Sequence, residues 1–325
     1  MTEIILWSVF YILITYLMQI IIHEAGHLIF GLLTNYKLIM FRVFRFALVR
    51  GTNGRFSLRI SRCSGSYGQC LMLPPDKEHY PYILTTMGGI ILNFITAALA
   101  SISIILYHPY IPFVHKLGVI LFVFYGYGFA ALNLLPFSGS GTMTDGIVLN
   151  ALSKNYFARG CNKSQLMAAR HLIYGKTYGE ISLELLSVPE GADLSNPVIG
   201  YLKILESYYY MDHRDWGSAK ECLDLFCPYM ELLPAWLKNT VLMEQLFISI
   251  MQRDNTIKDS SIYSSIKRYL KQSKSDYSTI RVCAAYEIYI NNTDKKTLLQ
   301  KTERNKENYI YQGEVKFCNS LLIEL

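Results

Sequence analysis

The sequence predicts a mainly α-helical fold: a polytopic membrane core of about three transmembrane helices with a small β-hairpin region, followed by a soluble all-α domain. Three long apolar stretches occur before residue 136, and from about residue 163 the pattern is helical without being membrane-like. The composition agrees, because 51% of the 325 residues are hydrophobic and the mean hydropathy is +0.21. We therefore expect a membrane core at 1–155 and a helical domain at 156–325.

The first apolar stretch predicts a helix at about 4–33. As one helix it would measure ~45 Å, which is longer than the ~30 Å hydrocarbon core of a bilayer. No basic segment precedes it and no small-residue cleavage site follows it. We therefore expect a retained membrane helix and not a cleaved signal peptide.

The segment at 38–73 has the pattern of short strands. Leu38 to Val49 is rich in apolar and β-branched residues, residues 51–54 read Gly-Thr-Asn-Gly, and residues 55–62 alternate polar with apolar. We expect one or two β-hairpins lying against the membrane surface. An ordinary connecting loop is the alternative.

Two further apolar stretches predict membrane helices at about 81–107 and 117–135. The first of these contains Asn93 within the apolar run 90–100. An asparagine inside a membrane helix needs a polar partner. That partner is either a catalytic site or a neighbouring helix, in a hydrogen bond without catalytic role.

The first helix carries His23-Glu24-Ala-Gly-His27, an H-E-x-x-H motif. Residues four apart lie on one face of a helix, so the imidazoles of His23 and His27 can bind one metal ion. Glu24 is adjacent to that face and can act as general base toward a water molecule. Imidazole ligands with an open water position favour one Zn²⁺ per chain. A structural histidine pair is the alternative.

Asp145 is the candidate third ligand, because catalytic zinc usually has three protein ligands. It is the only carboxylate between Glu78 and Glu180, and it follows the third apolar stretch on the side of the membrane where His27 lies. The alternative is that Asp145 only caps a helix beginning at Gly146. The Gly/Ser-rich loop at 137–144 could gate the entry of water.

The distribution of Lys and Arg between the loops predicts the orientation of the chain in the membrane. Residues 34–80 hold eight Lys and Arg residues, whereas residues 107–116 hold only Lys116. By the positive-inside rule the first loop is cytoplasmic, the N-terminus is outside and the helical domain is cytoplasmic. We expect an integral protein of a bacterial plasma membrane whose basic excess meets lipid and not nucleic acid. Seven cysteines without a C-x-x-C pair favour reduced thiols.

The helical domain shows repeated amphipathic patterns. Segments 196–210 and 215–226 predict an antiparallel helix pair, with Tyr208, Trp216, Ala219 and Leu223 spaced as in a tetratricopeptide-like unit. Further helices are expected at 234–251, 260–272 and 276–290, followed by a charged, exposed stretch at 295–308. The isolated His171 and His213 indicate no site there.

Three motifs in this order resemble the site-2 protease family of intramembrane zinc metalloproteases: His23-Glu24-x-x-His27, Gly89-x-x-x-Asn93, and Asn133-Leu-Leu-Pro136 followed by Asp145-Gly146. The resemblance covers about residues 1–155. It implies zinc bound by His23, His27 and Asp145, with Glu24 as base. It also implies that Asn93 lies beside the site, where it would orient the substrate or donate to the developing oxyanion.

The sequence departs from the family pattern at three places. Ile90 stands where a proline is usual, Thr144 stands where a leucine is usual, and the link at 137–144 is longer. No PDZ-like insertion separates the second and third helices.

The resemblance implies a zinc-dependent endopeptidase that hydrolyses a transmembrane or signal-peptide-like substrate near the cytoplasmic membrane face, in regulated proteolysis or peptide maturation. An export factor that includes such cleavage is a related reading. A different class is a catalytically silent membrane adaptor that binds a cytoplasmic protein through 156–325. Because an extended substrate needs backbone partners, we expect an edge strand within 38–73 to hold it, with Leu58 and Ile60 as positions to test.

Overall fold

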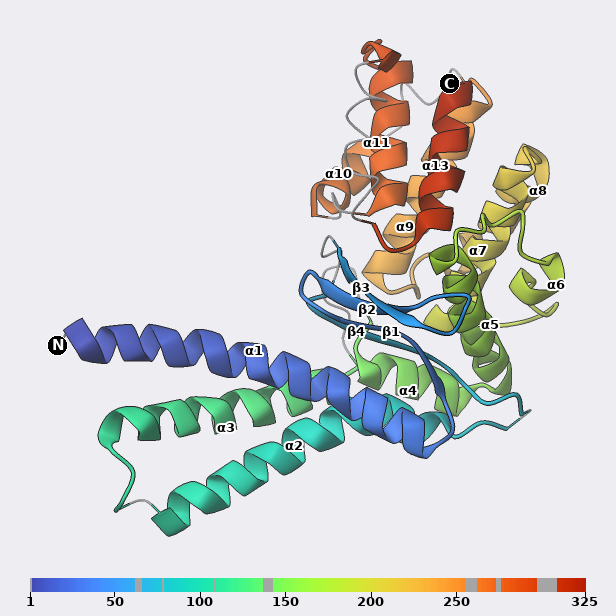
Figure 1. Cartoon of the computed structure of the whole chain (residues 1–325). Helices are drawn as coiled ribbons and strands as arrows, with labels where there is room; N and C mark the ends of the chain where they lie inside the picture. The colour runs from blue at the N-terminus through green and yellow to red at the C-terminus, as the bar shows by residue number, and fades with distance from the viewer. Residues whose placement is uncertain are drawn as a thin grey trace.

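The computed structural model describes residues 2–61, 66–77, 79–107, 109–136, 143–254, 262–272, 276–296 and 309–325. The fold is mainly α with one small antiparallel sheet, as predicted (Figure 1). Most of the Gly/Ser-rich loop at 137–144 and of the charged stretch at 295–308 lies outside the described residues.

Three helices are long and apolar enough to cross a membrane: α1 (Thr2–Leu33), α2 (Tyr82–Tyr107) and α3 (Phe113–Leu134). They run side by side, and the N-terminus lies at the end away from the helical domain (Figure 1). The predicted third helix was wrong in its start, because it begins at Phe113 and not at 117. Pro112 takes the N-cap position with φ −58°, so the helix begins directly after it despite the polar His115 and Lys116.

The predicted hairpins form a single four-stranded sheet. Its strands are β1 (Lys37–Val43), β2 (Phe46–Arg50), β3 (Phe56–Ile60) and β4 (Gly68–Leu73), in the order β3-β2-β1-β4 with every pair antiparallel. β3 and β4 are therefore its two edges. The sheet lies over the C-terminal half of α1 and over α4 (Asp145–Lys154) (Figure 1).

The two predicted domains meet without a linker at residue 155. Asn155 ends α4, and its side chain accepts a hydrogen bond from the backbone N–H of Phe157 at 2.9 Å, which caps α5 (Tyr156–Ile173). Tyr80, which precedes α2, donates its hydroxyl to the backbone carbonyl of Arg159 at 2.7 Å. One buried apolar cluster continues from Tyr80 into α5 and the helices beyond it.

The remaining helices all lie within residues 156–325, the range predicted to be helical. They are α6 (Leu183–Leu186), α7 (Pro197–Asp212), α8 (Trp216–Asp224), the 3₁₀ turn η1 (Cys227–Tyr229), α9 (Ala235–Met251), α10 (Ile262–Gln272), α11 (Tyr277–Tyr289) and α13 (Gln312–Glu324). The Asn196 side chain caps α7 by accepting from the N–H groups of Val198 and Ile199, as its place before Pro197 predicts.

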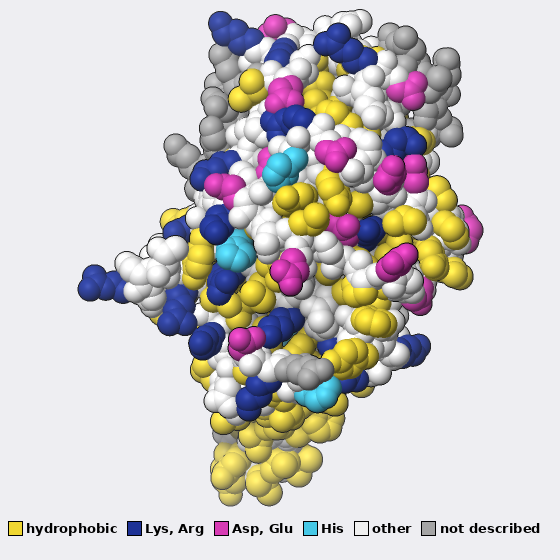
Figure 2. Space-filling view, turned by 90° about the vertical axis from the view of Figure 1, so that its right-hand side faces the viewer, with side chains coloured by type: hydrophobic (Ala, Val, Ile, Leu, Met, Phe, Trp, Pro, Cys, Tyr) yellow, Lys and Arg dark blue, Asp and Glu magenta, His cyan; other side chains and the backbone are white. Residues whose placement is uncertain are grey.

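The end of the chain returns to the sheet. Ile310 packs with Ile39, Met40 and Leu71, and the Gln69 side chain in β4 donates to the Tyr311 hydroxyl at 2.8 Å. Figure 2 shows the result from one side, with Lys and Arg side chains above a lower end that is covered by apolar side chains. The helical domain thus contacts the same strand that lines the candidate site below.

Candidate metal centre

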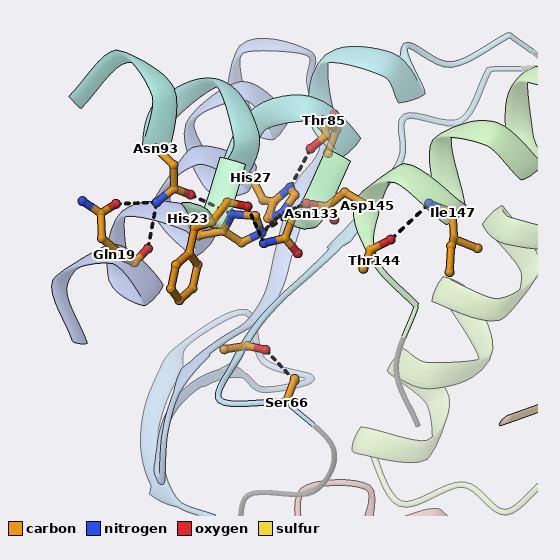
Figure 3. Close-up of polar contacts among 12 residues, drawn as sticks. Gln19, His23, His27, Ser66, Thr85, Asn93, Asn133, Thr144, Asp145 and Ile147 are labelled. Carbon is orange, nitrogen blue, oxygen red and sulfur yellow. Dashed lines mark hydrogen bonds and ion pairs between the residues drawn. The ribbon is translucent and has the colours of Figure 1, made fainter. Parts of the chain in front are cut away.

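Three polar residues at four-residue intervals form one buried face of α1. Gln19 is 0% exposed, His23 is 8% exposed and His27 lies one turn further on. This spacing places all three on one face of the helix, toward α2 and α4 (Figure 3). The polar face can persist in an apolar helix because each side chain has a partner inside the protein.

The two imidazoles meet the Asp145 carboxylate at the start of α4 (Figure 3). Asp145 Oδ2 lies 3.1 Å from His23 Nε2 and 3.3 Å from His27 Nε2, and the two Nε2 atoms are 3.2 Å apart. A tetrahedral Zn²⁺ with bonds of ~2.0–2.1 Å separates its ligand atoms by ~3.3 Å. The three atoms therefore have the spacing of three corners of a zinc tetrahedron.

The partners of His23 fix its tautomer. Its Nδ1 lies 2.8 Å from Asn93 Oδ1, an acceptor, so Nδ1 carries the proton. Asn93 is oriented in turn, because its Nδ2 donates to Gln19 Oε1 at 2.6 Å and to the Gln19 carbonyl at 3.1 Å. Gln19 Nε2 donates to the backbone carbonyl of Phe122 in α3 at 3.0 Å. When the ring is neutral, the proton on Nδ1 leaves a bare Nε2 facing the site.

His27 is fixed in the same way by α2. Its Nδ1 lies 2.8 Å from the backbone carbonyl of Thr85, which can only accept. With both rings neutral, two bare Nε2 atoms and a carboxylate oxygen converge, and all three are acceptors. Asp145 Oδ2 is buried and has no hydrogen-bond donor among the described residues. A shared proton could serve one of these contacts, whereas a metal cation serves all three at once.

Asp145 is suited to an ionised ligand role. Burial raises the pKa of its carboxyl group, and His27 and His23 lower it only when they carry a proton; a metal cation bound in place of that proton would lower it in the same way. Asp145 also lies in the first turn of α4, where the helix dipole favours negative charge.

Close backbone approaches hold the ligands in place. A Cβ atom at Gly89 would lie 2.6 Å from the His23 ring, so only glycine lets α2 pack against that imidazole. A Cβ atom at Gly146 would lie 2.0 Å from the Leu134 carbonyl oxygen, where α4 meets the end of α3. The alternative that Asp145 caps α4 is wrong. Thr144 is the N-cap, accepting from the Ile147 N–H, and its hydroxyl donates to the Leu135 carbonyl.

Glu24 lines the same cavity as the three ligands. It is 8% exposed, and a Cβ atom added at Gly68 in β4 would lie 2.3 Å from its Oε1. The Glu24 carboxylate makes no hydrogen bond to any residue that the structure describes, so its oxygens are available to a water molecule in the cavity. The cavity measures about 480 Å³, within the ~300–1,000 Å³ of small-ligand sites.

Asn93 differs from the expectation that it contacts substrate. It is 0% exposed and does not line the cavity, and both N–H groups of its amide already donate to Gln19. Its amide oxygen instead positions the imidazole of His23, a candidate metal ligand. Asn133, which belongs to the third motif, does line the cavity. One of its N–H groups donates to the Phe129 carbonyl at 3.0 Å.

Two groups that position the histidines were not predicted from the sequence: Gln19, which orients Asn93, and the backbone carbonyl of Thr85, which accepts from His27. Gln19 had a signal, because it lies four residues before His23 in an otherwise apolar helix. The Thr85 carbonyl had none, since any residue supplies a backbone oxygen.

The sheet offers one edge to the site and the other to the surroundings. Gly68, Gln69, Cys70 and Met72 of β4 line the cavity. Leu58 and Ile60, chosen from the sequence as edge positions near the site, belong to β3 at the opposite edge and are 70% and 58% exposed. β3 is an edge strand, as the choice of these positions assumed, but it lies at the edge away from the cavity because β1 and β2 separate it from β4.

Comparisons with known proteins identify no relative of this chain: no family model, no curated protein and no solved structure matches it.

Proposed function

We propose that this membrane protein is an intramembrane zinc-dependent endopeptidase. The observation that carries the proposal is the convergence of His23 Nε2, His27 Nε2 and Asp145 Oδ2, three acceptors at 3.1–3.3 Å with no donor between them. A zinc ion held there would supply Lewis-acid activation of a water molecule and of a peptide carbonyl. The neighbouring Glu24 carboxylate supplies the base that such a reaction needs.

The residues of the chain have complementary roles in hydrolysis. Glu24 accepts a proton from the attacking water, whose oxygen adds to the carbonyl carbon of the scissile bond. Glu24 then gives that proton to the leaving amine nitrogen as the C–N bond breaks. Asn133 has a second amide N–H that is not used by Phe129, and we assign to it a hydrogen bond to the developing oxyanion.

The substrate must be extended where it is cut, because the carbonyls of an intact helix are hydrogen-bonded and shielded. β4 is the edge strand whose residues line the cavity, so strand addition to β4 would supply partners for the extended segment. Proline scanning of 68–73 should impair cleavage while zinc is retained. Leu58→Pro in β3 is the matched control and should leave cleavage unchanged; equal losses at both edges would contradict strand addition.

We further propose the plasma membrane of a bacterium as the location, with the N-terminus outside and the helical domain in the cytoplasm. The support is the excess of Lys and Arg in the loop between α1 and α2. In this orientation the substrate is a membrane-embedded peptide or protein, and the helical domain is free to bind a cytoplasmic partner. Maleimide should label the exposed Cys227 only in inside-out vesicles; labelling from the outer face would refute the orientation.

The central test compares three versions of the full chain in nanodiscs. The readouts are zinc content and the cleavage of synthetic signal-peptide-like peptides, followed by mass spectrometry. The wild type should bind about one zinc and cleave. Glu24→Gln should retain zinc and lose cleavage, because a base is not a ligand, and His27→Ala should lose both. A zinc-free wild type, or a Glu24→Gln protein that cleaves at the wild-type rate, would overturn the proposal.

A further inference from the structure

A separate cavity of about 360 Å³, here called the α5 cavity, lies beside the start of α5 and the loop that leads into α2. The loop contributes Lys77 and Tyr80 to its wall, and most of the other lining residues belong to the first turns of α5. No described residue lines both this cavity and the one that holds Glu24 and the metal ligands. The α5 cavity is therefore a distinct site, with a volume in the ~300–1,000 Å³ range of small-ligand sites.

The charged residues that line the α5 cavity are all basic: Lys77, Arg159 and Lys163. Among the described carboxylates, Asp76 and Glu190 are neighbours in sequence of lining residues, but neither lines the cavity. Asp76 Oδ1 pairs with Lys163 Nζ at 2.7 Å, and the Asp76 side chain is fully exposed. An ion pair exposed in this way is weak and exchanges readily for another anion. Three cations thus face a cavity whose described wall holds no carboxylate.

Arg159 is held by contacts that leave part of its guanidinium for a ligand. Its Nε donates to the Leu152 carbonyl in α4 at 3.0 Å, and its Cζ lies 4.9 Å from the centre of the Tyr82 ring at the start of α2. Its two terminal amino groups make no hydrogen bond to any described residue, so they remain available as a pair of donors. Phosphate oxygens accept from such a pair in a bidentate arrangement.

The position of Tyr82 places the α5 cavity at the level of the lipid headgroups. α2 has 26 residues and measures ~39 Å, which exceeds the ~30 Å hydrocarbon core, so its ends reach the headgroup layers. Tyr82 begins this helix at the end that meets α4 (Figure 1). Tyr156 and Phe157, each 51% exposed, also line the cavity. Exposed aromatic rings beside Lys and Arg are typical of a membrane–water interface.

We propose that the α5 cavity binds the phosphate of an anionic phospholipid, with Arg159 as the bidentate donor and Lys77 and Lys163 as the neighbouring cations. A zwitterionic headgroup fits less well, because no described carboxylate in the wall meets its ammonium group. A soluble phosphate has no apolar part to cover Tyr156 and Phe157, whereas a lipid brings its glycerol and acyl chains. The proposal does not depend on the protease activity.

Competition between two lipids tests the proposal. The detergent-solubilised full chain is mixed with phosphatidylglycerol and phosphatidylcholine that carry the same acyl chains, and native mass spectrometry measures which lipid stays bound. The wild type should prefer phosphatidylglycerol by at least ~25-fold, because each positive charge near a lipid phosphate contributes ~5-fold. Lys77→Gln with Lys163→Gln should reduce that preference by ~25-fold, and both changes leave Arg159 and its packing in place.

Arg55→Gln with Arg59→Gln is the matched control. It removes the same number of charges from exposed positions of the β2–β3 hairpin that do not line the α5 cavity, and it should keep the preference of the wild type. Equal losses in the two double variants would show that basic residues attract anionic lipid without a defined site. A wild type that binds both lipids equally would overturn the proposal directly.

Two measurements on the wild type locate and identify the ligand, and they need no variant to fold. Phosphatidylglycerol with a photoreactive headgroup should crosslink to peptides that contain 77–80 or 156–163, whereas crosslinks confined to the β2–β3 hairpin would overturn the assignment of the cavity. Millimolar inorganic phosphate should leave the lipid bound. Complete displacement by inorganic phosphate would show that the site takes a soluble anion and not a lipid.

Discussion

Two buried polar clusters in this chain solve the problem of buried charge in opposite ways. In the membrane half, His23, His27 and Asp145 present three acceptors to one another with no donor among them. In the helical domain, Arg281 donates to Glu244, which also accepts from the Tyr208 hydroxyl at 2.7 Å. The first cluster contains no hydrogen-bond donor for its buried carboxylate oxygen among the described residues, whereas the second contains its own cation.

The comparison shows that the presence or absence of a cation within a cluster separates a candidate site from a structural cluster better than burial does. Arg281 and Glu244 are both 0% exposed, more completely buried than any metal ligand, and aromatic rings enclose the guanidinium. Both carboxylate oxygens of Glu244 accept from a donor inside that cluster. At the metal centre, by contrast, the second nitrogen of each histidine is occupied by a fixed acceptor, which forces the bare nitrogen toward Asp145.

The largest effect should follow from changing the cluster of His23, His27 and Asp145. Asp145→Asn replaces an anionic ligand by a neutral amide, and bound zinc should fall from about one per chain to an undetectable level after dialysis, measured by mass spectrometry of the metal. Cleavage should vanish with it. The Arg281→Met protein is the control and should keep its zinc; retention of full zinc by Asp145→Asn would show that the acceptors converge for another reason.

Breaking the Arg281–Glu244 pair should instead reduce the stability of the folded protein. Arg281→Met leaves the Glu244 carboxylate buried without its partner, and the free energy of unfolding should fall by about 3–5 kcal/mol. Adding Glu244→Leu removes the orphaned charge and should restore most of the loss. Chemical denaturation in detergent, followed by tryptophan fluorescence, measures both. A double variant no more stable than Arg281→Met would mean that packing, and not charge, sets the cost.

Much of this contrast could be predicted from the sequence, and the reasons differ by element. The H-E-x-x-H spacing requires only a helix, so the order of residues was enough to name His23, His27 and Glu24. Asp145 could be named because carboxylates are scarce in the membrane half. The helices of the second half follow from caps such as Asn196 and from apolar periodicity.

The features that could not be predicted from the sequence depend on contacts between segments that are far apart in the chain. The order β3-β2-β1-β4 cannot be deduced from alternation, so the sequence could not show that β4, and not the other edge strand β3, lines the cavity. The pairing of Arg281 with Glu244 joins α11 to α9, and neither residue has a local signal. The role of Asn93 was left between substrate contact and interhelical bonding, because only three dimensions show that both its N–H groups are occupied by Gln19.

A smaller effect should follow from loosening the metal centre without removing a ligand. Asn93→Leu takes away the acceptor for His23 Nδ1–H, so the ring loses its fixed tautomer and orientation. Zinc affinity should fall by about 10- to 100-fold, measured by competition with a chelator. Thr96→Val is the matched control one turn away on α2, because the Thr96 hydroxyl donates only to carbonyls of its own helix. Equal zinc affinities in the two variants would show that Asn93 contributes only to helix packing.

The last prediction concerns Glu314, a buried carboxyl group that has neither a cation nor a histidine as its hydrogen-bond partner. Its carboxyl group accepts from the Ser278 and Tyr309 hydroxyls. Burial raises the pKa of Glu314 to about 7, although these two hydrogen bonds act to lower it. Asp276 raises that pKa further and Arg281 opposes it, and the side chains of Tyr178, Tyr201 and Tyr311 also interact with the group. At neutral pH the carboxyl group is therefore about half protonated.

The sign of the resulting pH dependence follows from linkage. The folded state binds the Glu314 proton more tightly than the unfolded state, whose carboxyl has a pKa of about 4.5. The stabilisation is complete below about pH 4.5 and is lost as the pH rises through about 7, so the free energy of unfolding should fall by roughly 2–3 kcal/mol between pH 5 and 8. Thermal unfolding of the full chain at several pH values measures this slope. Subtracting the profile of Glu314→Gln cancels the contributions of all other groups, including His171, whose pKa burial lowers. A difference curve that is flat, or that rises with pH, would mean that Glu314 is ionised in the folded protein, like Glu244, and that the hydroxyl donors suffice to hold its charge.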